Sequence, residues 1–278
     1  GVVGVTLANG QTVASGGVIC NAPVWSLRSL LDDAGRRLLE TAEAPPNKRQ
    51  SINNDDNDGD NDATKAKGYL TNLDEIEQTR SFLHLHLALD ATDLDLTKLE
   101  AHYTVMTQGL SDPTAELNMI AVSNPCVLDD TLAPPGTIVV HAYGAGNEPY
   151  DIWNNNNSTK LSRAEYNALK EQRAQVLWDA VESIIPDAKS RTILSLIGSP
   201  ITHERYLRRP NGTYGAATED LLPDGSTAIG GLVLCGDSIF PGIGVPAVAV
   251  NGAGAANAMV SVWDHWRAMD RLKDQGVL

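Results

Sequence analysis

The residues best suited to chemistry lie near the carboxyl end, in CGDSIFPGIGVPAVAVNGAGAANAM, residues 235–259. In this stretch glycines, prolines and small apolar residues surround a single carboxylate, Asp237. Gly242, Gly244 and Ala247 have the spacing G-x-G-x-x-A, and glycines in such a loop let the backbone approach a ligand closely. Asp237 can accept hydrogen bonds from the hydroxyls of a ribose or ribityl chain. These residue types indicate a site for a nucleotide cofactor.

The elements expected around this stretch place its ligand at the end of a buried strand. GLVLC, residues 231–235, is a continuous apolar run typical of a strand buried on both faces. Gly236 and Asp237 follow its carboxyl end, where open α/β sheets bind ligands. Pro246 suits the first turn of a helix expected over residues 245–272, whose amino end directs a positive partial charge at the loop. An anionic or dipolar ligand is stabilised at such an end.

The spacing does not make this stretch the first turn of a Rossmann βαβ unit. Several residues separate the expected strand from Gly242, whereas the dinucleotide fingerprint turns immediately after its strand. Asp264 lies at about the distance of a ribose-binding acid, but inside the expected helix. The match alone is therefore weak support for dinucleotide binding.

The amino-terminal part predicts an α/β beginning followed by an acidic insertion. Residues 4–23 alternate polar and apolar side chains about Asn9-Gly10, which predicts a β-hairpin in which both turn residues tolerate positive φ. A short buried strand is expected at residues 17–20 and a helix at 25–42. Residues 45–68 are almost free of apolar side chains and are predicted to be disordered.

From Ser81 onward the pattern is that of an antiparallel sheet with one long helix. Short β-rich runs separated by turn residues predict strands within residues 81–90, 101–110, 117–125, 136–144 and 191–200. Residues 161–185 predict a helix, because Ser162 and Glu165 have the spacing of a capping box and Pro186 ends the pattern.

The composition describes a globular chain that does not bind nucleic acid. Its 278 residues are 42% hydrophobic and 20% charged. A formal net charge of −14 leaves no excess of basic groups for nucleic acid phosphates. Cys20, Cys126 and Cys235 have no CxxC spacing, so neither a disulfide framework nor a zinc site is predicted, and a reducing compartment is favoured.

The histidines predict no metal site. His84 and His86 share one face of an expected strand, but only His102 lies near them in the sequence, so the ligands for a metal ion are too few. Candidates for a general acid or base lie later in the sequence, at His203, Glu204 and Tyr206. No catalytic residue is assigned.

Several stretches resemble one family in the same order along the chain. Residues 231–259 are similar to the closing FAD-binding motif of the carotenoid desaturase and isomerase branch of the FAD-dependent amine-oxidase-like superfamily. SFLHLHLALD (81–90), LAPPGTIVVHAYGAGNEPYDIW (132–153) and SPITHERYLRRPNGTYGAA (199–217) resemble further parts of carotenoid isomerases of the prolycopene isomerase type. The resemblance covers nearly the whole chain except the acidic insertion.

This resemblance implies an FAD site built from seven residues. Gly236 and Asp237 would hold the ribityl-phosphate region of FAD. The residues expected against the isoalloxazine are Pro241, Gly242, Gly244, Val245 and Ala247. The amino-terminal G-x-G-x-x-G that binds the FAD diphosphate in this family has no match here, so the chain is expected to be a carboxyl-terminal fragment whose missing amino-terminal part is a partner.

The implied fold class is α/β (α+β). It consists of a partial FAD/NAD(P)-binding Rossmann-like domain with an inserted substrate domain of antiparallel sheet plus helices. Residues 1–44 and 206–278 are assigned to the FAD-binding domain, 45–68 to the insertion and 69–205 to the substrate-binding domain.

The function implied is FAD-dependent cis–trans isomerisation of a poly-cis-carotenoid such as prolycopene, without net redox change. The alternatives are a carotenoid desaturase or a retinol-saturase-like oxidoreductase and, from another class, a non-catalytic remnant or scaffold. A pigment pathway implies a plastid in an alga or plant, or the cytoplasmic membrane face in a bacterium. Peripheral membrane association is expected for the apolar substrate, and no apolar run has the roughly 18 to 20 residues of a membrane-spanning helix.

Overall fold

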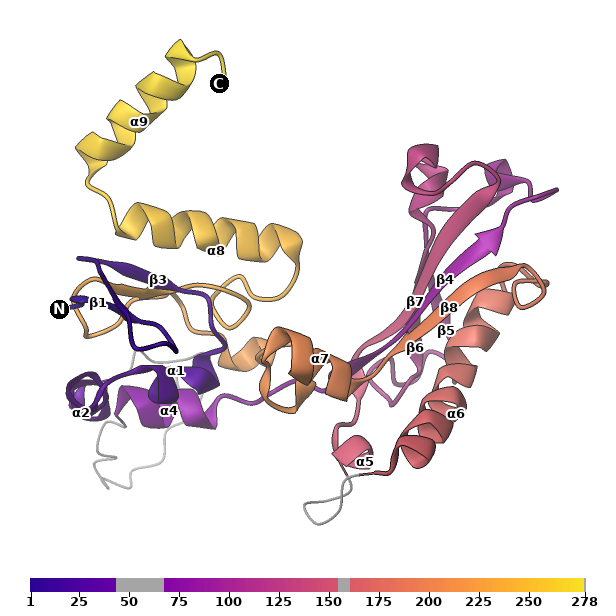
Figure 1. Cartoon of the computed structure of the whole chain (residues 1–278), viewed down its shortest axis with the longest axis horizontal. Helices are drawn as coiled ribbons and strands as arrows, with labels where there is room; N and C mark the ends of the chain where they lie inside the picture. Colours follow the sequence, from indigo (N-terminus) through magenta and orange to yellow (C-terminus); the bar gives the residue numbers. More distant parts are fainter. Residues whose placement is uncertain (44–67, 155–160, 278) are drawn as a thin grey trace. The chain divides into compact units, whose positions relative to one another are not determined.

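The computed structural model describes residues 1–43, 68–154 and 161–277, which form two compact units (Figure 1). The first unit combines Gly1–Gln78 with Gly215–Leu278, and the second unit is Thr79–Tyr214. The insertion predicted at residues 45–68 lies, except for Gly68, outside the described residues. The chain is therefore a mixed α/β protein in which a continuous segment is inserted between two parts of the first unit.

The limits of the inserted unit lie later in the chain than residues 69 and 206. Helix α4 (Tyr69–Glu75) contributes to the hydrophobic core of the first unit, since Tyr69 and Leu70 are buried there. At the other limit Tyr214 packs edge-on against Phe82, with ring centroids 4.1 Å apart. Residues 69–78, the start of the predicted substrate domain, thus belong to the first unit, and residues 206–214 belong to the second unit.

The first unit begins with the predicted hairpin. Strands β1 (Gly4–Thr6) and β2 (Thr12–Ala14) pair antiparallel. The Leu7 N–H donates to the Gln11 carbonyl at 2.8 Å, so the turn contains more than the two residues Asn9-Gly10. Only Gly10 of that pair has a positive φ, of 84°. The hairpin is confirmed, and of the two turn residues that tolerate a positive φ only Gly10 adopts one.

A parallel strand pair joins the two parts of the first unit. Strand β3 (Val18–Cys20) pairs with β9 (Leu232–Leu234), and Leu232 and Leu234 are buried as predicted. The helix predicted at residues 25–42 is broken into α1 (Leu27–Leu30) and α2 (Asp33–Thr41). The break follows from Asp32, whose side chain accepts a hydrogen bond from the Gly35 N–H and caps α2.

The carboxyl-terminal helix is also two helices rather than one. Helix α8 (Val245–Ala258) is followed by α9 (Val262–Asp274), with a bend of 119° between them. Ser261 causes the new start, because its hydroxyl accepts a hydrogen bond from the Asp264 N–H. Among the described residues no single helix has the length and composition to cross a membrane; α8 and α9 meet that test only as a bent pair.

The second unit is built on the predicted antiparallel sheet. Its strand order is β5-β6-β7-β4-β8. The strands are β4 (Ser81–Asp90), β5 (His102–Met106), β6 (Met119–Ser123), β7 (Thr137–Glu148) and β8 (Thr192–Gly198). Strand β7 continues beyond the predicted end at residue 144. Every neighbouring pair for which a register is described is antiparallel.

One face of this sheet is covered by helix α6 (Arg163–Glu182), which lies along the sheet in Figure 1. The Ser162 and Glu165 capping box is present, as predicted. Alternate residues of β4 face the helix and are fully or almost fully buried; these are Leu83, Leu85, Leu87 and Leu89. Because side chains alternate along a strand, Phe82, His84, His86 and Ala88 share the opposite face.

A buried ion pair connects β7 to α6. The Glu148 carboxylate is fully buried and accepts hydrogen bonds from Trp153 Nε1 at 2.8 Å and from Arg173 Nη2 at 2.6 Å. Burial raises the pKa of Glu148, and the Arg173 guanidinium opposes that rise. Arg173 also bonds to the half-exposed Glu116 at 2.6 Å. Removal of Arg173 would therefore leave the buried Glu148 carboxylate without a counter-charge.

We expect Arg173→Leu to lower the free energy of unfolding by about 3 to 5 kcal/mol, because it leaves a buried carboxylate unpaired. Arg163→Leu, at the exposed start of the same helix, is the matched control and should change the free energy by less than about 0.5 kcal/mol. Urea denaturation of both variants checks the prediction. Equal effects of the two substitutions would contradict it.

Candidate functional site

The loop after β9 contains three glycines in the left-handed backbone region. Gly236, Gly242 and Gly244 have φ of 114°, 105° and 108°. A Cβ atom at Gly242 would lie 2.9 Å from a Leu221 methyl carbon, and the φ of Gly242 also disfavours a side chain. A Cβ atom at Gly244 would meet nothing within 4 Å. The backbone at Gly244 is therefore open to close approach by a ligand.

Two polar residues at the start of this loop are buried. Asp237 is 9% exposed and Ser238 3% exposed. Within the part of the chain that the structure describes, the Ser238 hydroxyl has no hydrogen-bond partner. An unsatisfied buried hydroxyl is costly for a protein, and a ligand with hydroxyl or phosphate oxygens would satisfy it. The donor and acceptor set at Asp237 and Ser238 thus fits the ribityl region of FAD.

The amino end of α8 follows directly. Gly244 precedes the helix, and Pro246 lies in its first turn as predicted. Val245 is 81% exposed and Ala247 half-buried, so both remain near the surface at the start of the helix. Pro241 is also exposed. A helix amino end with apolar side chains around it can contact a planar apolar ring and stabilise negative charge on that ring.

Asn251 fixes the loop against α8, and the sequence reasoning did not identify it. Its Oδ1 accepts a hydrogen bond from the Gly236 N–H at 2.9 Å, and its Nδ2 donates to the Gly236 carbonyl at 2.7 Å. Asn251 is 7% exposed. The signal in the sequence is an amide among small apolar residues of the helix, which contains a second one at Asn257. Asn251 thereby determines where Gly236 and the following Asp237 lie relative to α8.

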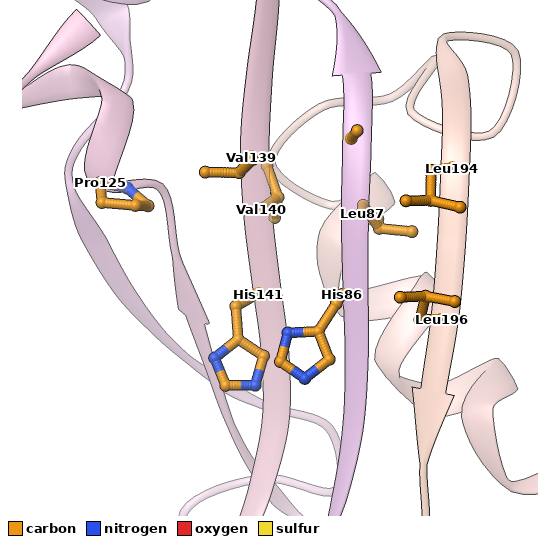
Figure 2. Close-up of a pocket in the computed structure, with 9 residues that line it drawn as sticks. His86, Leu87, Pro125, Val139, Val140, His141, Leu194 and Leu196 are labelled. Carbon is orange, nitrogen blue, oxygen red and sulfur yellow. The ribbon is translucent and has the colours of Figure 1, made fainter. Parts of the chain in front are cut away.

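The uncovered face of the sheet in the second unit is the other candidate site. A pocket of about 260 Å³ lies on it. Its lining side chains are apolar except for two imidazoles, and include Ala88, Pro125, Val139, Leu194 and Leu196 with His86 and His141 (Figure 2). Leu194 and Leu196 are 52% and 56% exposed, so this apolar surface is accessible to a ligand.

The imidazoles form a stacked group at one end of the pocket. His86 lies directly opposite His141 across β4 and β7, with ring centroids 4.2 Å apart. Figure 2 shows these two rings side by side. His84 Nδ1 lies 2.8 Å from His141 Nε2, and His84 Nε2 lies 2.6 Å from His203 Nε2. Gly198 lies opposite His84 on β8, and a Cβ there would make ordinary van der Waals contact with His84.

These imidazoles are neutral at neutral pH. Burial, reinforced by the neighbouring histidines, lowers the pKa of His84 to about 3. Burial and the adjacent His86 lower the pKa of His141 to about 4. Burial also lowers the pKa of His203. The face therefore carries polar nitrogen atoms without positive charge, which is compatible with an apolar ligand and with metal coordination.

The candidate acids and bases have different positions. His203, on α7 (Pro200–Leu207), joins the imidazole group. Glu204 accepts a hydrogen bond from the Tyr150 hydroxyl at 2.5 Å. Tyr206 is 71% exposed. His102 bonds to Ser123 at 2.8 Å on the far strand pair of the sheet. The sequence did not predict that His141 and His203 contact His84 and His86.

Comparisons with known proteins find partial matches in sequence and in structure. The chain is 31% identical to mouse pyridine nucleotide-disulfide oxidoreductase domain-containing protein 2 over 151 residues, 49% of this chain and 24% of that protein. A solved oxidoreductase from Methanosarcina mazei aligns with a TM-score of 0.48 and 16% identity, over 88% of this chain and 44% of that chain. No family model matches the chain.

More particularly, the chain is a distant homologue of prolycopene isomerases, as the resemblance predicted. It is 30% identical to the chloroplastic prolycopene isomerase of Daucus carota over 266 residues, which cover 93% of this chain and 37% of that protein. The Arabidopsis thaliana chloroplastic enzyme is 28% identical over 93% of this chain and 39% of its own length. The chain therefore spans less than half the length of these curated relatives.

The low pKa values of the imidazoles predict acid destabilisation. An unfolded histidine titrates near pH 6.5, whereas His84 and His141 stay neutral in the fold down to about pH 3 and 4. Between these values the unfolded chain binds more protons, so the free energy of unfolding falls as the pH is lowered. We expect urea midpoints to decrease from pH 7.5 to pH 5, with EDTA present to exclude metal ions.

The decrease should be smaller in His84→Phe, which removes the most strongly shifted imidazole. His265→Phe, on exposed α9, is the control and should follow the parent chain. An identical pH dependence in His84→Phe and the parent chain would show that the buried imidazoles do not cause the effect.

Proposed function

We propose that the chain is part of an FAD-dependent carotenoid isomerase that converts cis double bonds of a long polyene to trans without net redox change. The observation that carries the proposal is the collinear homology to prolycopene isomerases over 93% of the chain. This homology extends over both the glycine loop and the sheet with the uncovered face. Prolycopene is the substrate we propose, and because the relatives are chloroplastic, a plastid is the proposed location.

In this proposal the loop after β9 holds FAD. Asp237 and Ser238 would accept or donate hydrogen bonds at the ribityl chain, with Gly236 fixed by Asn251. The residues proposed against the isoalloxazine are Pro241, Gly242, Gly244, Val245 and Ala247. The α8 amino end would stabilise negative charge on the ring. When bound, FAD supplies the transient electron donation that lowers the bond order of the polyene; the protein residues orient it and exclude water.

The uncovered sheet face is proposed to contact the polyene. The apolar side chains of Val139, Leu194 and Leu196 provide surface that a hydrocarbon removes from water. His86 and His141 border that surface as neutral rings, so their desolvation by a hydrocarbon costs less than that of imidazolium ions. Substrate delivery from a lipid bilayer by peripheral association is the proposed route for so apolar a molecule.

Net redox chemistry is the second candidate. The similarity to a protein named as an oxidoreductase-domain protein favours a desaturase or retinol-saturase-like reaction. A non-catalytic scaffold is the candidate from another class. The three candidates differ in what they do to the mass and geometry of a polyene.

The deciding experiment supplies the longer protein of which the chain is proposed to be part with reduced FAD and prolycopene in liposomes without oxygen. We expect a trans-enriched product of unchanged mass, measured by chromatography and mass spectrometry. A product that differs by two hydrogens would support the redox candidate instead. Flavin binding without any conversion of either polyene isomer would support the scaffold.

Ser238→Ala tests the cofactor site with two readouts of opposite sign. Removing an unsatisfied buried hydroxyl should leave the apoprotein as stable or slightly more stable. Loss of one hydrogen bond to FAD should weaken flavin binding by about three- to tenfold. Ser261→Ala, which removes the α9 cap, is the control and should lower stability without changing FAD affinity.

Flavin fluorescence quenching measures the affinity, and thermal unfolding measures the stability. Unchanged FAD affinity in Ser238→Ala would exclude this hydroxyl from the cofactor site.

A further inference from the structure

We propose that His84, His86 and His141 bind a divalent transition-metal ion of the zinc class on the uncovered face of the sheet, with His203 as the residue that orients His84. One ring nitrogen from each of the three ligands lies within 4.8 Å of the others. The inference is independent of the proposed FAD chemistry, because it rests on residues of the second unit alone.

Sheet register brings the ligands together. His84 and His86 lie two residues apart on β4 and so project on one face. His141 on β7 pairs directly with His86. Two ligands from one strand and a third from its neighbour are therefore fixed by backbone hydrogen bonds, so little conformational freedom is lost on binding an ion.

Metal binding requires the rings to move apart and to turn. His84 Nδ1 and His141 Nε2 are 2.8 Å apart. Two nitrogens bound to one tetrahedral zinc ion, each at about 2.0 to 2.1 Å, lie about 3.3 Å apart. The two rings must therefore separate by about half an ångström and turn, so that both nitrogen lone pairs point at the ion instead of at each other. The third ligand, His86, is exposed, and its ring has to turn out of the stack on His141 to direct a nitrogen at the same point.

His203 supplies the contact that metal-binding histidines usually have. Its Nε2 lies 2.6 Å from His84 Nε2, the ring nitrogen that is not directed at His141. A hydrogen bond on the outer nitrogen fixes the ring orientation and tautomer of a ligating histidine. The His203 and His84 rings are nearly coplanar in orientation, at 6°, with centroids 4.8 Å apart. His203 is therefore a positioning residue for His84.

The protonation state and ligand type favour this class of ion. Neutral imidazole is the form that coordinates a metal, and burial keeps His84 and His141 neutral at neutral pH. Nitrogen donors without carboxylates favour zinc, nickel or copper over calcium or magnesium. Three protein ligands leave one coordination position for water or an oxygen-bearing ligand. Because His86 and His141 also line the apolar pocket, that position borders the pocket.

The test uses the untagged chain, treated with EDTA and dialysed, and titrated with Zn²⁺ by calorimetry and with Co²⁺ by visible absorption. We expect one equivalent to bind, with the d–d absorption of a low-coordinate Co²⁺ site. His86→Gln and His141→Gln should each weaken binding by more than tenfold. His102→Gln, on the same sheet face but outside the group, is the matched control and should bind as the parent does.

His203→Gln should weaken binding by about 10- to 100-fold while the Co²⁺ spectrum keeps its form, as expected for a residue outside the coordination sphere. Zn²⁺ should also raise the thermal midpoint of the parent and of His102→Gln, but not of His86→Gln, whose exposed side chain can be replaced without unfolding the sheet. Absence of saturable binding, or equal loss in His102→Gln and His86→Gln, would overturn the proposal.

Discussion

The alternation of side chains along β4 is the constraint on which the second unit depends. Four leucines of this strand are buried against α6, and they fix which residues face the other way. A shift of one residue in register would bury the imidazoles of His84 and His86 and expose the leucines. The free energy of burying the leucines is thus what holds the histidines on the uncovered face, in register with His141.

Polar anchors complete the positioning in each unit. The Glu148 and Arg173 pair joins the end of β7 to α6, so it supports the sheet from the face opposite to the histidines. Asn251 has the corresponding role in the first unit, where its amide holds the backbone of Gly236 against α8. In both cases one buried polar side chain satisfies groups that would otherwise be costly to remove from water.

The two units offer different chemistry to a ligand. The loop after β9 combines open backbone at Gly244 with buried oxygens at Asp237 and Ser238, as a cofactor with many hydroxyls requires. The sheet offers apolar surface beside neutral imidazoles. A flavin-dependent reaction on a hydrocarbon needs both kinds of surface, which is why the proposed function accounts for each unit with its own residues.

The sequence by itself determined the features that depend on neighbours a few residues away. Strand alternation, the hairpin, the capping box at Ser162, Pro246 in the first turn of α8 and the glycine loop all follow from local backbone preferences. The family resemblance followed from the same local motifs. Periodicity alone predicted one helix over residues 25–42 and one over residues 245–272. In the structure Asp32 and Ser261 each cap a new helix within these ranges, because a cap competes with continuation of the preceding helix.

Only the tertiary structure decided which distant residues meet. His141 and His203 lie 57 and 119 residues from His84, and nothing local relates them. Their contact depends on β7 being the neighbour of β4 and on the exact register between them. The same holds for β3 and β9, at opposite ends of the chain. Strand order and register are set by the packing of the whole sheet, since the alternation of polar and apolar residues in one strand is compatible with many neighbouring strands.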